Sequence, residues 1–245
     1  MHEVNLQGKS VFPIVSPEKT INYKWYDGSE NIDSKVLPMS LEQINCQKEQ
    51  NGLTLPPVVN EGTVLMRHPY LPNSLVSANM TMGEFLDEKL SYYAVILNYL
   101  GATAQTLEAR VVSRQSRKFD GKGKLSIKGN KLEGKVSAVR RLFSKVKSTK
   151  RIEGTGKLDY NKALELAKQY GLENDIFVKT VLELRHENPV PSFRFETEIA
   201  KEYNDTLDVA ASMVAGAGVF KLNGSFKKSV STREEIWILQ DISFK

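Results

Sequence analysis

The 245-residue sequence is poor in the residue types that build most metal and redox sites. It contains a single cysteine, Cys46, and three histidines, His2, His68 and His186. One cysteine excludes an internal disulfide, which fits a reducing compartment. No histidine has another histidine or a cysteine at ligand spacing, so we expect neither a metal site nor another cofactor.

A long hydrophobic run is also missing. The longest apolar stretch near a predicted helix, Tyr92 to Leu97, is too short to cross a bilayer. The N-terminus, Met1-His2-Glu3, continues into polar residues without the apolar core of a secretory signal. Since a hydrophobic fraction of 40% supports an ordinary core, we predict a soluble cytoplasmic protein that meets a membrane, if at all, as a peripheral protein.

The sequence lacks the common catalytic constellations as well. Gly154 to Lys157 resemble the end of a P-loop, but Arg151 and Leu158 stand where that pattern requires a glycine and a hydroxyl residue. Glu196 and Glu198 fall on one face of a predicted strand, and paired acids are what a metal-dependent nuclease uses. The same alternation is typical of any half-exposed strand. We therefore expect a non-enzymatic protein and keep the nuclease as an alternative.

Positive charge, by contrast, is concentrated in one segment. Residues 109 to 151 hold fifteen lysines and arginines and two acids, Asp120 and Glu133, a net charge of 15 − 2 = +13. The rest of the chain has 34 − 15 = 19 basic and 29 − 2 = 27 acidic residues, a net charge of −8. Such segregation indicates an anionic partner and says little about the fold.

Residues 1–80 are rich in proline, asparagine and serine and keep no period for long. Short strands are expected at Ser10–Val15 and Gly62–Met66, between breaks made by proline. The prolines are Pro13, Pro17, Pro38, Pro56, Pro57, Pro69 and Pro72. We predict an irregular arm that wraps over the rest of the protein or over a partner.

Three helices are predicted from periodicity in residues 81–245, which we expect to form one domain. Thr81 and Glu84 form a capping box, leucines and aromatics follow at helical spacing, and Gly101 stands where a left-handed C-cap ends the helix. A second helix is expected at Tyr160–Tyr170 and a third, rich in small residues, at Leu207–Ala217.

Alternating apolar and polar residues predict the strands of this domain. We expect them at residues 107–119, 125–128, 132–138, 176–185, 193–199, 220–227 and 232–244. Asp120-Gly121 supplies turn chemistry between the first two. The order of elements implies an α+β fold with a twisted, largely antiparallel β-sheet and about three helices.

The basic segment coincides with a β-ribbon at residues 107–158. Charges on a strand face often only protect a sheet edge from aggregation, but a net charge of +13 exceeds that need. We predict that the ribbon binds an anionic surface through Arg114, Arg117, Lys118, Lys122, Lys124, Lys128, Lys131, Lys135, Arg140 and Arg141. The ribbon has only two aromatics, Phe119 and Phe143, for base stacking. Attraction to phosphates would therefore be independent of nucleotide sequence and sensitive to salt.

The C-terminal third carries a local resemblance to a known family. The residues that carry it are Leu207-Asp208-Val209-Ala210-Ala211-Ser212-Met213, followed by Ala215, Gly218, Gly224 and Ser225. This stretch resembles part of the stonefish-toxin branch of perforin-like pore formers, in which a similar small-residue helix leads into a strand. The resemblance covers about forty residues and implies a β-rich, membrane-interacting fold.

We therefore predict a non-enzymatic binding or assembly protein whose cationic ribbon engages an anionic surface. As the anionic partner we place lipid, with membrane interaction or pore formation, before nucleic acid. Sequence-independent nucleic-acid binding is the first alternative, and a nuclease using Glu196 and Glu198 is the second. Docking of an acidic partner protein and self-assembly also remain open.

Overall fold

The structure, a computed structural model, describes eight stretches of the chain. They are residues 5–23, 32–71, 73–78, 82–119, 125–130, 157–187, 190–215 and 232–244, together with Phe226 and Val230. The chain divides into two units, each built from three segments. The first unit comprises Met1–Thr81, Arg114–Asn130 and Glu202–Arg233, and the second comprises Met82–Ser113, Lys131–Lys201 and Glu234–Lys245.

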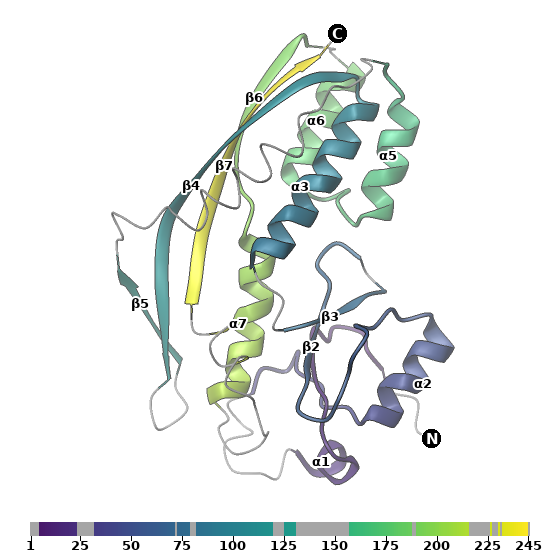
Figure 1. Ribbon diagram of the computed structural model, residues 1–245, viewed down its shortest axis with the longest axis vertical. Helices are drawn as coiled ribbons and strands as arrows, with labels where there is room; N and C mark the ends of the chain where they lie inside the picture. Colours follow the sequence, from purple (N-terminus) through teal and green to yellow (C-terminus); the bar gives the residue numbers. More distant parts are fainter. Residues whose placement is uncertain are drawn as a thin grey trace. The chain divides into compact units, whose positions relative to one another are not determined.

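A small antiparallel sheet lies in the first unit. Its strands are β1 (Val11–Pro13), β2 (Val64–Arg67) and β3 (Leu75–Ser77), in the order β1-β2-β3. Two helices accompany them, α1 (Pro17–Asn22) and α2 (Leu41–Asn51) (Figure 1). The core around the sheet is fully buried and apolar; it includes Phe12, Ile14, Met39, Ile44 and Leu65.

Helix α2 is delimited at both ends by local chemistry. The Ser40 side chain accepts a hydrogen bond from the Gln43 amide at 3.1 Å, and the Gln43 side chain accepts one from the Ser40 amide at 2.9 Å. This capping box satisfies amides that a helix start leaves without partners. Gly52 follows the helix with a φ of +62°, the left-handed conformation that ends it.

The prediction of an irregular arm for residues 1–80 is corrected by these elements. The two short strands expected there are present as β1 and β2, but the same segment also contains β3, α1 and α2. Strands of three or four residues are too short to display a period, and α2 is almost wholly polar, so the pattern of the sequence did not reveal them.

Helix α7 (Lys201–Ala215) belongs to the first unit apart from its first residue. It corresponds to the small-residue helix expected at Leu207–Ala217, and its buried face is formed by Tyr203, Leu207, Ala210, Ala211 and Met213. The Ser212 hydroxyl accepts a hydrogen bond from the Asp33 amide at 2.9 Å, which ties the helix to the N-terminal segment.

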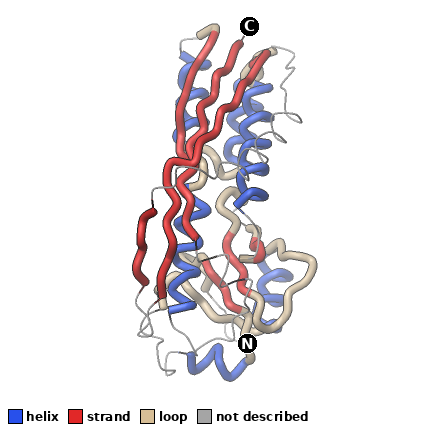
Figure 2. Tube along the Cα trace, turned by 60° about the vertical axis from the view of Figure 1, so that its left-hand side comes forward, coloured by secondary structure: helices blue, strands red, loops and turns tan. Residues whose placement is uncertain are grey.

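The second unit packs three helices against β-strands (Figure 1). The helices are α3 (Met82–Tyr99), α5 (Tyr160–Gln169) and α6 (Ile176–Glu187), and α5 contacts both others. Strands β4 (Ala102–Phe119), β5 (Leu125–Asn130), β6 (Ser192–Glu198) and β7 (Thr232–Phe244) form an antiparallel sheet in the order β5-β4-β7-β6. Of these strands, β5, the end of β4 from Arg114 and the first two residues of β7 belong to the first unit. Figure 2 shows the three long strands side by side. The α+β class with antiparallel sheets is thus confirmed.

One strand prediction was wrong. Residues 176–185, expected as a strand, form helix α6. The buried residues Phe177, Val178, Val181, Leu182 and Arg185 recur at helical spacing, and this arrangement packs them into the core. The β-branched valines and threonine in the segment favoured a strand in isolation, but tertiary burial outweighs that preference.

The remaining predictions have mixed outcomes. Helices α3 and α5 are confirmed, and Gly101 and Gly171 follow them with φ of +83° and +61°. Strands β4, β5, β6 and β7 are also confirmed, with β4 starting earlier than expected. The capping residue Thr81, the turn at 120–124 and the strand expected at 132–138 lie outside the described residues. The strand expected at 220–227 is described only at Phe226, whose carbonyl accepts from the Val230 amide as in a helical turn.

Candidate anionic-surface interface

The candidate interface is the hairpin of β4 and β5, and its backbone register is defined. The two strands pair antiparallel from Arg114 opposite Asn130 to Phe119 opposite Leu125. Since successive residues of a strand alternate between faces, positions 114, 116 and 118 share one face with 126, 128 and 130. The antiparallel pairing predicted from alternation is therefore present, and among the described strands β5 lies at one edge of the sheet (Figure 1).

Four of the ten predicted contact residues lie on this hairpin. Arg114, Lys118 and Lys128 occupy one face by register, whereas Arg117 belongs to the opposite face, where it is paired with Ile127. The other six lie outside the described residues: Lys122, Lys124, Lys131, Lys135, Arg140 and Arg141. The register thus brings three predicted basic positions onto one face and separates the fourth from them.

The alternative catalytic residues, Glu196 and Glu198, lie on β6. As predicted, they share one face; they stand opposite Leu239 and Trp237 of β7. Glu196 is exposed and Glu198 is half-buried. Within the described part of the chain, no group of three or more histidine, cysteine or acidic side chains is placed to hold a metal ion.

The histidines and the cysteine have structural surroundings where they are described. His68 is buried, and its Nδ1 accepts hydrogen bonds from the amides of Tyr70 and Leu71 at 3.1 Å each, which closes a turn. The ring of His186 lies 4.7 Å from that of Tyr160, centroid to centroid. Cys46 is a free, half-buried thiol on α2.

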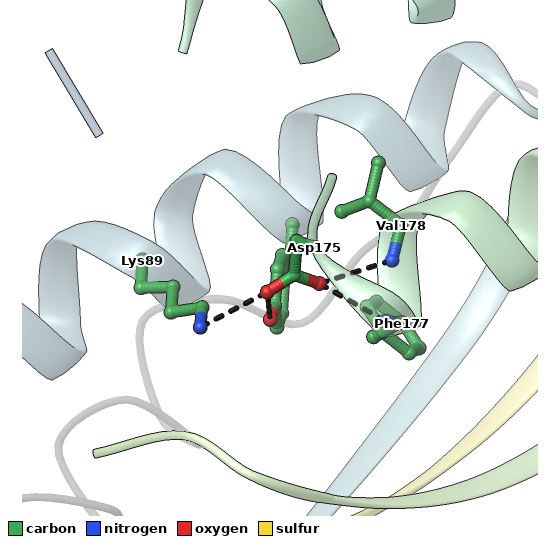
Figure 3. Close-up of polar contacts among 5 residues, drawn as sticks. Lys89, Asp175, Phe177 and Val178 are labelled. Carbon is green, nitrogen blue, oxygen red and sulfur yellow. Dashed lines mark hydrogen bonds and ion pairs between the residues drawn. The ribbon is translucent and has the colours of Figure 1, made fainter. Parts of the chain in front are cut away.

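A buried ionic cluster in the second unit was not foreseen from the sequence (Figure 3). The Lys89 ammonium, on α3, lies 3.0 Å from Asp175 Oδ2, and the two side chains are 1% and 8% exposed. The Tyr93 hydroxyl donates to the same oxygen at 2.8 Å. Asp175 Oδ1 accepts from the amides of Phe177 and Val178 at 3.1 Å each, so the carboxylate also caps the N-terminus of α6.

This cluster has a structural explanation that needs no catalytic role. A buried charge is tolerated when it is paired and its remaining hydrogen-bonding capacity is used, and Asp175 meets both conditions. Its carboxylate joins α3 to the first turn of α6. The signal in the sequence was the position of Lys89, which falls on the apolar stripe of α3 three residues from Leu86 and four from Tyr93.

Two further side chains of the second unit, Tyr92 and Arg185, have shifted pKa values. Burial, together with the hydrogen bond that the hydroxyl donates to Glu88 at 2.5 Å, raises the pKa of Tyr92 above its usual range. The Tyr92 ring also stacks on Tyr170 at 4.1 Å. Burial lowers the pKa of Arg185, whose guanidinium donates to the Leu100 and Val190 carbonyls at 3.0 and 3.1 Å.

The first unit contains a polar cavity of about 550 Å³. Its lining is mostly carboxamide and includes Asn5, Leu6, Gln7, Gln47, Asn51, Leu53, Arg67 and Asn73. Arg67 is held in place by hydrogen bonds to the carbonyls of Lys9 and Leu6 at 3.0 and 3.1 Å. These described lining residues can hydrogen-bond, but they supply neither a carboxylate nor an imidazole for acid–base chemistry.

Comparisons with known proteins add no relative. No protein-family model, no curated protein and no solved structure matches the chain. The resemblance to perforin-like pore formers therefore stays a prediction. Its described residues, 207–213 and 215, lie in α7, as the expected small-residue helix requires. No helix among the described residues is long and apolar enough to cross a bilayer.

Proposed function

We propose that this chain is a non-enzymatic binding protein whose cationic ribbon, residues 107–158, engages an anionic surface. The observation that carries the proposal is the segregation of charge, +13 within residues 109 to 151 against −8 elsewhere. Charge segregation of this size attracts polyanions. At physiological salt, dissolved ions screen this attraction beyond about 8 Å.

The backbone of the hairpin supports this proposal. Arg114, Lys118 and Lys128 share one face by register, so three charges are concentrated on it. Each basic residue near an anionic lipid surface contributes about 1 kcal/mol, so a few such residues are enough for measurable adsorption.

Anionic lipid is the partner that we place first, because the described hairpin lacks the features of specific nucleic-acid recognition. Phe119 is the only aromatic residue among the described positions of β4 and β5, whereas single-strand binding relies on successive stacking platforms. Headgroup phosphates require charge and no such platforms. Assembly on the membrane would follow from adsorption.

The proposal is tested by co-sedimentation of the full chain with neutral and anionic vesicles, with dye release as a second readout. The variant Arg114→Gln, Arg117→Gln, Lys118→Gln, Lys128→Gln removes four charges from the hairpin. Arg114, Lys118 and Lys128 share the face proposed to meet the surface, so at about 1 kcal/mol for each of these three, partition onto anionic vesicles should fall by roughly a hundredfold.

The matched control removes the same charge elsewhere. Lys48, Lys168, Lys179 and Lys201 are exposed lysines outside the ribbon, and changing all four to glutamine alters net charge equally. This control should keep most of the binding. Equal losses in both variants would show that net charge and not the ribbon attracts the vesicles, and full binding by the hairpin variant would refute the proposal.

Double-stranded DNA as competitor separates the lipid from the nucleic-acid alternative. If DNA displaces the chain from vesicles, and if DNA affinity falls steeply with the logarithm of salt concentration, nucleic acid becomes the preferred partner. If neither vesicles nor DNA bind at physiological salt, an acidic protein partner takes first place.

The nuclease alternative has a test of its own. It requires hydrolysis of DNA or RNA that depends on a divalent cation and is lost in both Glu196→Ala and Glu198→Ala. The two carboxylates share a face of β6, so the alternative keeps its geometric premise. The absence of cleavage with magnesium or manganese would remove it.

A further inference from the structure

Strand β6 ends the four-stranded sheet at the margin opposite to β5 in the strand order. Its hydrogen bonds define which of its residues face β7. The Ile199 amide donates to the Ile236 carbonyl at 2.9 Å, and the Pro191 carbonyl accepts from the Phe244 amide at 2.8 Å. Since backbone groups alternate in direction along a strand, the odd-numbered residues are directed at β7. The amides and carbonyls of the even-numbered residues, 192 to 198, are directed outward.

The side chains on the solvent face of β6 carry charges of both signs. Arg194 and Glu196 are both exposed and stand two residues apart. Arg194 Nε lies 3.4 Å from Asp241 Oδ1 on β7, and both of these side chains are more than half exposed. Charges on an edge strand oppose its pairing unless opposite charges meet, so the register decides whether β6 can pair.

The opposite face of β6 is aromatic. Phe193 and Phe195 are half-buried, with ring centroids 5.6 Å apart, and Phe195 lies 5.7 Å from Phe177 of α6. Thr197 completes this face and is buried. The two phenylalanines therefore retain apolar surface beside a margin whose backbone groups are directed outward.

We propose that β6 pairs antiparallel with β6 of a second copy of this chain, with Phe195 on the two-fold axis. In this register Arg194 stands opposite Glu196 of the second copy, and the two-fold axis places Glu196 opposite Arg194 of the second copy. Ser192 stands opposite Glu198 of the partner. All four outward-directed residues exchange main-chain hydrogen bonds, and the half-buried phenylalanines of both copies form one continuous apolar row.

The charges select this register over its neighbours. Shifting the axis to residue 194 places arginine opposite arginine, and shifting it to residue 196 places glutamate opposite glutamate. Like charges directly opposite in an antiparallel pair are destabilising, whereas opposite charges stabilise it. A shift that opposes odd with even residues would place phenylalanines against the charged face, which the pleat disfavours.

The test is the mass of the full chain in solution, measured by sedimentation velocity across a concentration series. The wild-type chain should populate a dimer. Arg194→Glu opposes acid to acid at both symmetric positions, and Glu196→Arg opposes arginine to arginine, so each should weaken self-association by roughly tenfold or more. Circular dichroism verifies that both variants stay folded.

Two combinations restore the complementarity. The double variant Arg194→Glu, Glu196→Arg exchanges the charges and should dimerise again. An equimolar mixture of the two single variants should form a heterodimer, because each arginine then meets a glutamate. Lys179→Glu reverses a charge at an exposed position of α6 and should leave the dimer unchanged.

The proposal is overturned if the wild-type chain is monomeric at 100-fold above the lowest concentration tested, or if charge reversal leaves a dimer intact. It is equally overturned if the mixture stays monomeric, or if the chain forms open-ended assemblies, which a two-fold pairing excludes. This inference is independent of the proposed anionic-surface binding, since the vesicle assays and the mass measurement report on different strands.

Discussion

At the residue scale, the stability of the second unit depends on the buried ion pair between Lys89 and Asp175. Removing one member leaves the other charge buried without its counter-ion, which typically costs about 3–5 kcal/mol of unfolding free energy. Lys89→Met retains the length of the side chain and should show this loss in urea denaturation.

Asp175→Asn should cost at least as much, because it weakens the cap of α6 as well as stranding the ammonium. In the double variant no charge is stranded, so the two losses should not add. Simple additivity would contradict the view that the pair acts as one unit. Lys162→Met, at the exposed pair with Glu165, is the control and should leave the urea midpoint unchanged.

Tyr92 gives the unfolding free energy a dependence on alkaline pH. Its pKa is raised in the folded state, so above about pH 10, where an unfolded tyrosine ionises, the folded chain binds the proton more tightly. The stabilisation is complete below that pH and is lost as the pH rises toward the folded pKa. Denaturation at pH 8 to 11 should therefore show a steeper decline for wild type than for Tyr92→Phe. Parallel curves would mean that the hydroxyl has no such linkage.

At the scale of single elements, the C-terminus of α2 depends on a left-handed residue. Gly52 has a φ of +62°, and a Cβ added there would meet no heavy atom within 4 Å. The cost of Gly52→Ala is therefore conformational and should be about 1–2 kcal/mol of unfolding free energy. Asparagine tolerates this conformation better, so Gly52→Asn should cost less. Thermal unfolding of both variants distinguishes strain from a steric clash, which would penalise asparagine more.

The elements also show what could be predicted from the sequence. Helices α3 and α5 were predicted because their apolar residues repeat over at least two turns and a glycine at positive φ follows each of them. Helix α6 was mistaken for a strand because Val178, Thr180 and Leu184 also fit an alternating pattern. The deciding information, burial of Phe177 and Val181 on a single side, belongs to the tertiary structure.

The candidate sites also differ in how much of each the sequence predicts. The basic segment was recognisable because net charge is a property of composition, and alternation predicted the strands β4 and β5 but not the register that pairs them. The partnership of Lys89 with Asp175 joins residues 86 positions apart, and no local pattern encodes such a pair. The proposed pairing of β6 with its copy could not be derived from the sequence, because it depends on the position of β6 at the end of the strand order.

At the scale of the whole molecule, the two units share the chain in an interleaved manner. Each unit contains three segments, so the chain passes between them five times. Neither unit can be excised as one continuous piece, and we expect the two to unfold in one cooperative transition.

This expectation can be checked with one tryptophan. In a Trp25→Phe background, Trp237 of β7 reports on the second unit, while Phe12→Ala removes a fully buried ring from the first unit at a cost of about 3–5 kcal/mol. The urea midpoint seen by Trp237 fluorescence should fall together with that seen by circular dichroism. If Phe12→Ala left the urea midpoint of Trp237 fluorescence unchanged, the two units would unfold separately.

The strand order β5-β4-β7-β6 leaves one margin of the sheet to the cationic hairpin and the other to β6. A chain joined to its copy through β6 would carry two cationic hairpins. Once the first hairpin binds, the second experiences a high local concentration of the same surface, and the apparent affinity rises without any new contact. Adsorption that is weak for a single chain would then increase steeply at the protein concentration at which dimers form. That concentration is set by the dissociation constant of the β6 pairing.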